Sequence, residues 1–184
     1  MNDLNSGWVI GEKHRQTYAS HVIAILGEDA PPVYSRGDKF YNVNRWTTRF
    51  FIGALCEWAK EHPKEKPTES LVRSLVNKVN NDSSPAPHIV IARTPDVLPS
   101  YMALALVGGA YHEAFHTLYS GRKDLKTGEI WDIISNHWDE DVDWGSMAPL
   151  LLTLSNLVED IRIEQLGCKE FPGVTESLAN LQDF

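Results

Sequence analysis

The sequence predicts an α+β domain that is predominantly helical, with a small β element packed beside the helix that carries its main motif. Apolar residues recur at intervals of three and four in most segments of the chain, which is the periodicity of amphipathic helices. Residues 88–92 are instead rich in β-branched side chains and are flanked by prolines, as strands are. The 184 residues, 42% of them hydrophobic, are enough for one compact domain with its own core.

Glycine, proline and polar residues divide the chain into its expected elements. Residues 11–26 have helical spacing and are followed by Gly27 and two prolines, so the first helix is expected there. Residues 33–45 are rich in aromatic residues, glycine and asparagine, which favours a hairpin or an irregular link. The polar residues 80–87 and the acidic residues 139–143 are expected to form loops. Further helices are expected over residues 47–62, 67–79, 99–119, 146–166 and 174–181, with Gly167 ending the fourth of these. Residues 129–138 are expected to form a short helix or a turn.

Charge and composition exclude several classes of partner. Seventeen Lys and Arg against 25 Asp and Glu give a net charge of −8, which repels nucleic-acid phosphates and anionic membrane surfaces. We therefore expect no nucleic-acid partner and no membrane partner, and the apolar stretches are too short for a transmembrane helix. The two cysteines, Cys56 and Cys168, form no C-x-x-C pair, and the N-terminus lacks the features of a signal peptide. These features predict a cytoplasmic protein.

The main motif is H-E-x-x-H, formed by His112, Glu113 and His116 inside an expected helix. Residues four apart lie on one helix face, so both imidazoles can bind one zinc ion. Glu113 lies about 100° round the helix from His112 and is expected to reach a water activated by that metal. It would act as a general base, taking a proton from the water and returning it to the leaving amine. The motif predicts one zinc ion per chain and a peptide or protein substrate.

A catalytic zinc site usually has three protein ligands and one water, so a third ligand is expected downstream. The last long helix carries four charged residues in an otherwise apolar segment, at Glu159, Asp160, Arg162 and Glu164. On a helical projection Glu159 lies opposite the leucine-rich side, and we predict it as the third ligand, with Asp160 as the second choice. Asn156, Arg162, Glu164 and whichever acid is not the ligand are predicted to orient the histidines or to pair with one another.

Other interpretations of these residues are open at the level of sequence. Glu159 and its charged neighbours can instead form a buried ion-pair network between helices. His137 lies beside the acidic residues 139–143 and could supply a ligand, although capping of that loop is its more ordinary role. Residues 88–92 would form an edge strand that holds an extended peptide next to the motif helix.

The last part of the chain resembles a known family. It has the pattern V-E-x-x-R-x-E-x-x-G over residues 158–167, then P-G-V over residues 172–174 and L-A-x-L over residues 178–181. This combination is similar to the N-terminal region of the T subunit of aerobic cobaltochelatase, the CobT-like proteins. Those subunits lack a dependable H-E-x-x-H. Phage-encoded zinc metallopeptidases associated with a von Willebrand A (VWA) domain combine H-E-x-x-H with an E-D-x-R-x-E helix, and this sequence is closer to that pattern.

The resemblance implies a modular protein and two alternative functions. Residues 1–184 would be a single metallopeptidase-like domain at the N-terminus of a longer chain with a C-terminal VWA domain. The first function is a zinc peptidase with a zincin-like fold of the gluzincin type, in which His112, His116 and Glu159 bind zinc and Glu113 activates water. The alternative is a CobT-like cobaltochelatase or chaperone-type subunit that partners an AAA+ ATPase of the MoxR or CobS type, with a structural metal or none. Ligand count distinguishes the two, because a structural zinc site is closed by four protein ligands.

Overall fold

The structure is a computed structural model that describes residues 8–9, 12–35, 41–43, 47–82, 87–91, 97–98, 100–120 and 124–182. These residues form two compact units. The predominantly helical character with a small β component is confirmed. That residues 1–184 form one domain with a VWA domain after it stays a prediction, as does the zincin-like fold. The first unit takes its described residues from 1–44, 85–121 and 160–184, and the second takes them from 45–84 and 122–159.

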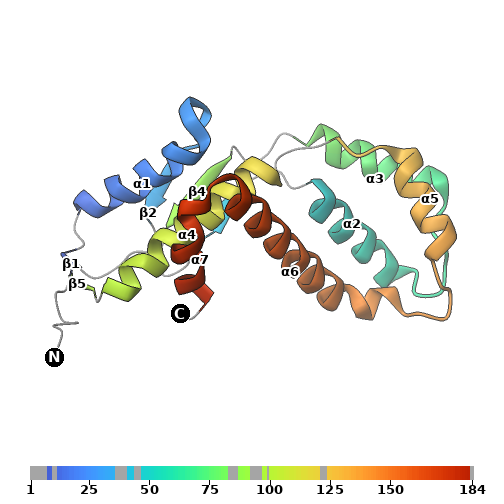
Figure 1. The fold of residues 1–184 in the computed structure, drawn as a ribbon. Coiled ribbons are helices and arrows are strands. Elements are labelled where there is room, and N and C mark those ends of the chain that lie inside the picture. Colours follow the sequence, from blue (N-terminus) through green and yellow to red (C-terminus); the bar gives the residue numbers. More distant parts are fainter. Residues whose placement is uncertain are drawn as a thin grey trace. The chain divides into compact units, whose positions relative to one another are not determined.

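The helices of the first unit pack around α4, the helix that carries the two motif histidines (Figure 1). α4 spans Ser100–Tyr119, as its apolar spacing predicted. It lies against α1 (Glu12–Leu26), against α7 (Thr175–Gln182) and against two strands of a small sheet. A 3-10 turn over Gly27–Asp29 follows α1, and another over Pro172–Val174 precedes α7. The motif helix is therefore the centre of this unit.

The described strands form two small sheets, one of order β2-β4-β3 and one that pairs β1 with β5. β4 is parallel to β2 and antiparallel to β3, with Val90 opposite Tyr34 on one side and opposite Tyr41 on the other. β1 and β5 are antiparallel. The strands are β1 (Trp8–Val9), β2 (Val33–Ser35), β3 (Tyr41–Val43), β4 (His88–Ile91) and β5 (Val97–Leu98).

This strand order corrects two predictions. Of the two alternatives for residues 33–45, the hairpin is wrong, because β4 lies between β2 and β3 and pairs with both. The irregular link falls on residues 36–40, which lie outside the described residues. Because it pairs on both sides, β4 is a central strand and not the edge strand expected over residues 88–92; Ala92 itself lies outside the described residues. Its burial agrees with this position, since Ile89, Val90 and Ile91 are all 1% exposed or less, as in a strand covered on both faces.

Two hydrophobic clusters hold α4 in place. The first joins α4 to α1 and β4, and the second joins α4 to α7 and to the end of α6 (Trp144–Glu170). Two sides of α4 are thus fixed by packing, which leaves a third side for polar residues. The buried members are Tyr18, Val22, Ile89, Ile91, Leu106, Ala110 and Ala114 in the first cluster, and Phe115, Ile163, Val174 and Leu178 in the second.

Two glycines allow neighbouring helices to approach α4 closely. A Cβ on Gly108 would lie 2.1 Å from the carbonyl oxygen of Ser177 in α7, and a Cβ on Gly167 would lie 2.1 Å from the Phe115 ring. No side chain fits at such distances. The prediction that Gly167 ends its helix is wrong, because α6 continues through it to Glu170. The glycine is needed there for the contact with Phe115.

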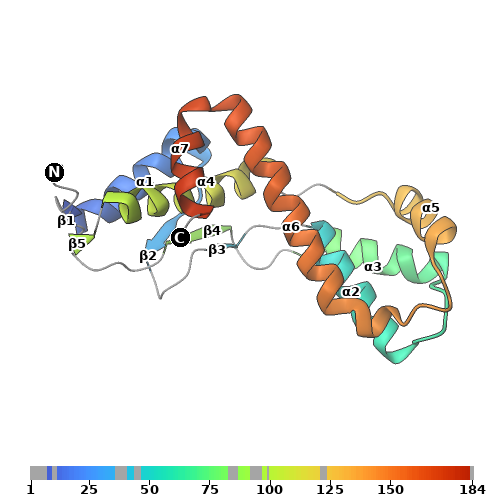
Figure 2. The ribbon, with the colours of Figure 1, turned by 60° about the horizontal axis from the view of Figure 1, so that its bottom comes forward.

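The second unit is built on three helices that share one core, beside residues 144–159 of α6 (Figure 2). They are α2 (Thr47–Glu61), α3 (Glu69–Asn81) and α5 (Thr127–His137). The hydroxyl of Thr68 accepts a hydrogen bond from the backbone N–H of Leu71 and caps α3. The buried core residues are Phe51, Val72, Val76, Val79 and Ile134.

Residues 144–159 of α6 expose much of their apolar surface. Leu154, Leu157 and Val158 are 45%, 53% and 64% exposed, whereas Glu159 beside them is 7% exposed. The sequence pattern favours the opposite arrangement, with leucines in and the carboxylate out. Among the described residues, no helix combines the length and hydropathy that crossing a bilayer requires.

Candidate metal centre

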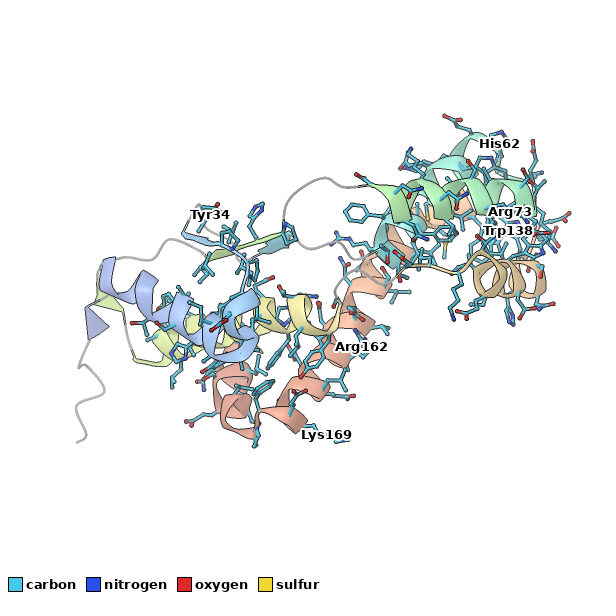
Figure 3. All side chains as sticks on the ribbon, turned by 90° about the horizontal axis from the view of Figure 1, so that it is seen from above. Tyr34, His62, Arg73, Trp138, Arg162 and Lys169 are labelled. Atoms are coloured by element: carbon cyan, nitrogen blue, oxygen red, sulfur yellow. The ribbon has the colours of Figure 1, made fainter. Side chains whose placement is uncertain are left out.

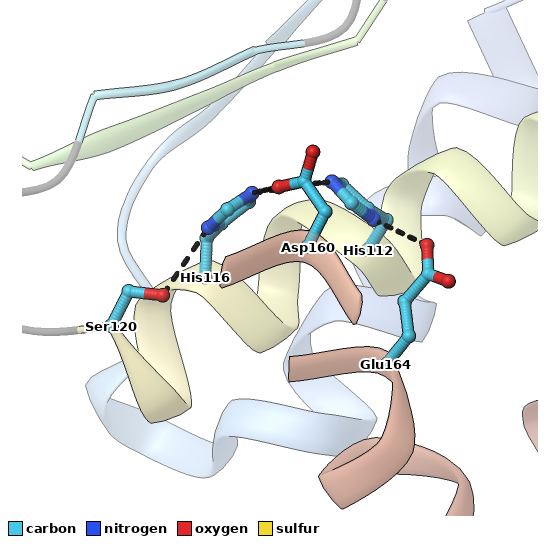
Figure 4. A network of polar contacts seen from close by, with 5 residues as sticks. All are labelled: His112, His116, Ser120, Asp160 and Glu164. Atoms are coloured by element: carbon cyan, nitrogen blue, oxygen red, sulfur yellow. Dashed lines mark hydrogen bonds and ion pairs between the residues drawn. The ribbon is translucent and has the colours of Figure 1, made fainter. Parts of the chain in front are cut away.

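The two motif histidines lie one turn apart on α4 and turn their rings toward one space (Figure 4). The Nε2 atoms of His112 and His116 are 3.2 Å apart, and the ring planes are inclined by 81°. The two side chains are 16% and 17% exposed. Two imidazole nitrogens that face each other at this distance need a proton or a cation between them.

Asp160 of α6 completes a group of three. Its Oδ1 lies 3.1 Å from Nε2 of His116 and 3.7 Å from Nε2 of His112. Ligand atoms about 2.0–2.2 Å from a tetrahedral zinc ion are roughly 3.3–3.5 Å from one another, and the three separations scatter around that value. The group could therefore hold a metal ion, and its two imidazoles and one carboxylate are donors that suit zinc. The Asp160 side chain is 39% exposed, so the centre opens to solvent.

The outward nitrogen of each histidine has a partner of its own (Figure 4). Nδ1 of His112 lies 2.8 Å from Oε1 of Glu164, and Nδ1 of His116 lies 3.3 Å from Oγ of Ser120. An ionised carboxylate only accepts hydrogen bonds, so Nδ1 of His112 carries the proton and donates it to Glu164. The lone pair of Nε2 then faces the centre. Such partners fix the tautomer and the ring orientation of metal-binding histidines.

Glu113 is the buried carboxylate next to this centre. It is 6% exposed, and burial raises its pKa to about 6, while positive charge on His112 and His116 acts in the opposite direction. A general base acts most efficiently when its pKa lies near the working pH. The surroundings of Glu113 therefore match the role that the motif predicts for it.

The pKa of His112 is subject to opposing effects. Burial lowers it, the hydrogen bond to Glu164 and the charges of Glu113 and Asp160 raise it, and the net direction is upward. Without a metal, this imidazole thus keeps a proton at higher pH than a free histidine does. A metal ion must displace that proton, so metal affinity is expected to fall as the pH falls.

The structure separates the two candidates for the third ligand. Asp160, the second choice, lies with the histidines, whereas Glu159, the first choice, lines an apolar cavity of the second unit. Successive residues of a helix point about 100° apart, so the two carboxylates face different surroundings. The prediction of Glu159 assumes that the leucine-rich side of α6 is its packed side. In the structure those leucines are exposed, so this assumption is wrong.

The other predicted residues have varied places. Glu164 contacts His112, and Nη2 of Arg162 donates to the carbonyl oxygen of Tyr119 at 3.0 Å, which ties α6 to the C-terminal end of α4. Asn156 belongs to the second unit, where its Oδ1 is buried without a hydrogen-bond partner among the described residues. His137 lines the same cavity as Glu159. The structure thus brings Glu164 to the metal centre and leaves Asn156 and His137 outside it.

Ser120 is the site residue that the sequence interpretation missed. It is 3% exposed and lies four residues after His116, as His116 lies four residues after His112. Ser120 directly follows the last residue of α4 and continues the row of the two histidines by one turn. The spacing that identified the histidines could have identified the serine, had the row been extended by one turn.

Comparisons of the chain with protein families, with curated proteins and with solved structures give no significant match. The resemblance to CobT-like proteins and to VWA-associated peptidases therefore stays a prediction. Any function proposed for the centre depends on its own geometry and chemistry.

Proposed function

We propose that this chain is a zinc-dependent peptidase, with His112, His116 and Asp160 as metal ligands and Glu113 as general base. The observation that carries the proposal is the convergence of three ligand atoms on one centre, with a partner behind each imidazole. When bound, zinc lowers the pKa of a water molecule and polarises the carbonyl of the substrate.

Glu113 moves the proton in the proposed reaction. As a carboxylate it takes a proton from the attacking water, and it then donates that proton to the nitrogen of the leaving amine. Its burial supports this cycle, because a pKa of about 6 leaves the carboxyl ionised at neutral pH and yet basic enough to accept a proton. Glu164 and Ser120 hold the imidazole rings in position.

The number of ligands favours hydrolysis over a structural metal. Among the described residues the converging group has three members, which leaves one position of a tetrahedral ion for water or substrate. The set is His, His, Asp and not the His, His, Glu set of the gluzincin type. The alternative function, a CobT-like subunit that docks an AAA+ ATPase, stays a prediction.

We infer that an extended peptide substrate would lie along β3. Of the described strands of this sheet, β2 and β3 are the outer ones, and β3 packs against α4. A peptide that adds to an outer strand is held by main-chain hydrogen bonds. Such binding tolerates many side chains, so it suits a peptidase of broad specificity.

The test uses wild type, Glu113→Gln and the control Glu159→Gln, purified without added metal. Elemental mass spectrometry measures zinc, and a fluorescein-labelled casein measures hydrolysis. We expect one zinc ion per chain in all three, and hydrolysis at least about 100-fold slower in Glu113→Gln alone. Hydrolysis by Glu113→Gln at the wild-type rate would contradict the assigned base. A zinc-loaded wild type that cleaves nothing would favour a structural metal.

A further inference from the structure

The second unit contains an apolar groove between α2, α5 and residues 144–159 of α6, which we call the three-helix groove. Its volume is about 550 Å³. It is lined by Leu55 from α2, by Ile134 from α5 and Trp138 directly after it, and by Leu154 and Val158 from α6. Figure 3 labels Trp138 among the side chains of this unit. None of the metal-centre residues lines the groove, so the two features can be tested separately.

The mouth of the groove favours a large occupant over a small molecule. The volume lies within the range of about 300–1,000 Å³ that small-molecule sites span, so size alone does not decide. However, Ile133, Leu154 and Val158 are 58%, 45% and 64% exposed at the mouth. A small ligand confined to the groove would leave these side chains in water. A protein segment that crosses the mouth would bury them as well.

The charges around the groove favour a basic occupant. Residues 127–159, which include the α5 and α6 walls, contain seven Asp and Glu and no Lys or Arg, whereas α2 carries two charges of each sign. Four of these acids lie in the exposed loop 139–143, which joins Trp138 to Trp144, and both tryptophans line the groove. Negative charge therefore flanks an apolar opening, and a complementary partner carries Lys or Arg beside its apolar residues.

We propose that the three-helix groove docks an amphipathic helix of a partner protein. Its apolar side chains enter the groove, and its basic side chains pair with the acidic loop 139–143. Helices that bind in grooves present apolar anchors at i, i+3, i+4 and i+7. The α6 wall offers the same spacing, at Leu151, Leu154, Ser155 and Val158. The docking site is independent of the proposed peptidase activity.

The experiment measures fluorescence anisotropy of a labelled peptide titrated with the full chain at about 150 mM salt. The probe is a peptide of about four helical turns, with leucine at i, i+3, i+4 and i+7 and lysine elsewhere. A second probe has glutamate in place of each lysine. We expect the basic probe to bind at least about tenfold more tightly than the acidic one.

A matched pair of variants locates the binding. Leu154 lines the groove, and Leu157, one turn further along the same helix and similarly exposed, does not. Leu154→Gln is expected to weaken binding of the basic probe at least about tenfold, and Leu157→Gln to change it less than about threefold. Removing three of the four loop charges by Asp139→Asn, Glu140→Gln and Asp141→Asn is expected to weaken binding by about tenfold.

Three results would overturn the proposal. The first is equal affinity for the basic and acidic probes, and the second is equal loss in Leu154→Gln and Leu157→Gln. The third is a wild-type dimer in sedimentation that Leu154→Gln dissociates while the basic probe fails to bind. That result would assign the groove to a second copy of this chain. Loss of zinc on chelation is expected to leave probe binding unchanged.

Discussion

The metal centre of the first unit and the three-helix groove of the second are both spaces that side chains line without filling. At the centre, three polar atoms lie within 3.7 Å of one another and the histidines are held from behind. The groove is about 550 Å³ in volume and almost entirely apolar. Polar interactions are directional, so the centre selects one small cation. Apolar contacts are not directional, so the groove selects only a class of partner, and the surrounding charge restricts that class further.

The largest expected effect tests whether Asp160 belongs to the centre and Glu159 to the groove. Asp160→Ala removes one of the three converging atoms, and we expect it to lower zinc affinity by more than about 100-fold, beyond the loss that an outer partner causes. Glu159→Ala is expected to change zinc affinity less than about threefold. Competition with a chromophoric chelator measures both. Equal losses in the two variants would break the distinction between the regions.

A smaller effect is expected from the partners behind the histidines. Glu164→Ala is expected to lower zinc affinity by about 10- to 100-fold, because it removes a charged acceptor 2.8 Å from His112. Ser120→Ala is expected to cause a loss of a few-fold, since the serine is uncharged and its contact with His116 is 3.3 Å long. The same chelator assay ranks them. A larger loss of zinc affinity in Ser120→Ala than in Glu164→Ala would contradict this ranking. It would mean that the contact behind His116 contributes more to metal binding than the contact behind His112.

The third prediction concerns the stability of the metal-free protein. Because the pKa of Glu113 is raised in the folded chain, the fold is stabilised when this carboxyl is protonated. The stabilisation is greatest below pH 4.5 and is lost as the pH rises to about 6. Above that range, burying the ionised Glu113 costs roughly 2 kcal/mol. Glu113→Gln is therefore expected to be the more stable protein at pH 8, by roughly that amount.

Urea unfolding in the presence of a chelator measures this difference at pH 8 and at pH 4.5. The difference is expected to shrink to well below about 1 kcal/mol at the lower pH, where the carboxyl is protonated in the folded state and about half protonated in the unfolded chain. Leu154→Gln, a groove variant, should show no such dependence on pH. A stability gain in Glu113→Gln that persists unchanged at pH 4.5 would mean that the ionised carboxylate is not what destabilises the fold.

Features set by neighbouring residues on one helix were the predictable ones. Thr68 caps α3 by a hydrogen bond with Leu71 in its first turn, so neighbouring residues alone determine where that helix starts. The row formed by His112 and His116 is equally local, because any helix over these residues places both rings on one face. The predicted limits of α4 agree with the structure for the same reason.

Features that depend on contacts between distant segments were not predictable. The choice between Glu159 and Asp160 depends on the rotation of α6 about its axis. Ile163 and Gly167 set that rotation where they pack with Phe115 of α4, and Asp160 lies one turn from Ile163 on the same face. The insertion of β4 between β2 and β3 is likewise set by pairing across the chain. No spacing within one helix carries this information.

The close approaches at Gly108 and Gly167 have a thermodynamic consequence for the centre. The backbone of α7 meets α4 directly at Gly108, and α6 packs through Gly167 onto the Phe115 ring of α4, so neighbouring helices hold the motif helix in place before any ion binds. Zinc-finger peptides gain their fold on binding metal. In a preorganised site little conformational entropy remains to be lost. Zinc binding should therefore release heat and protons, while the helix content of the chain hardly changes.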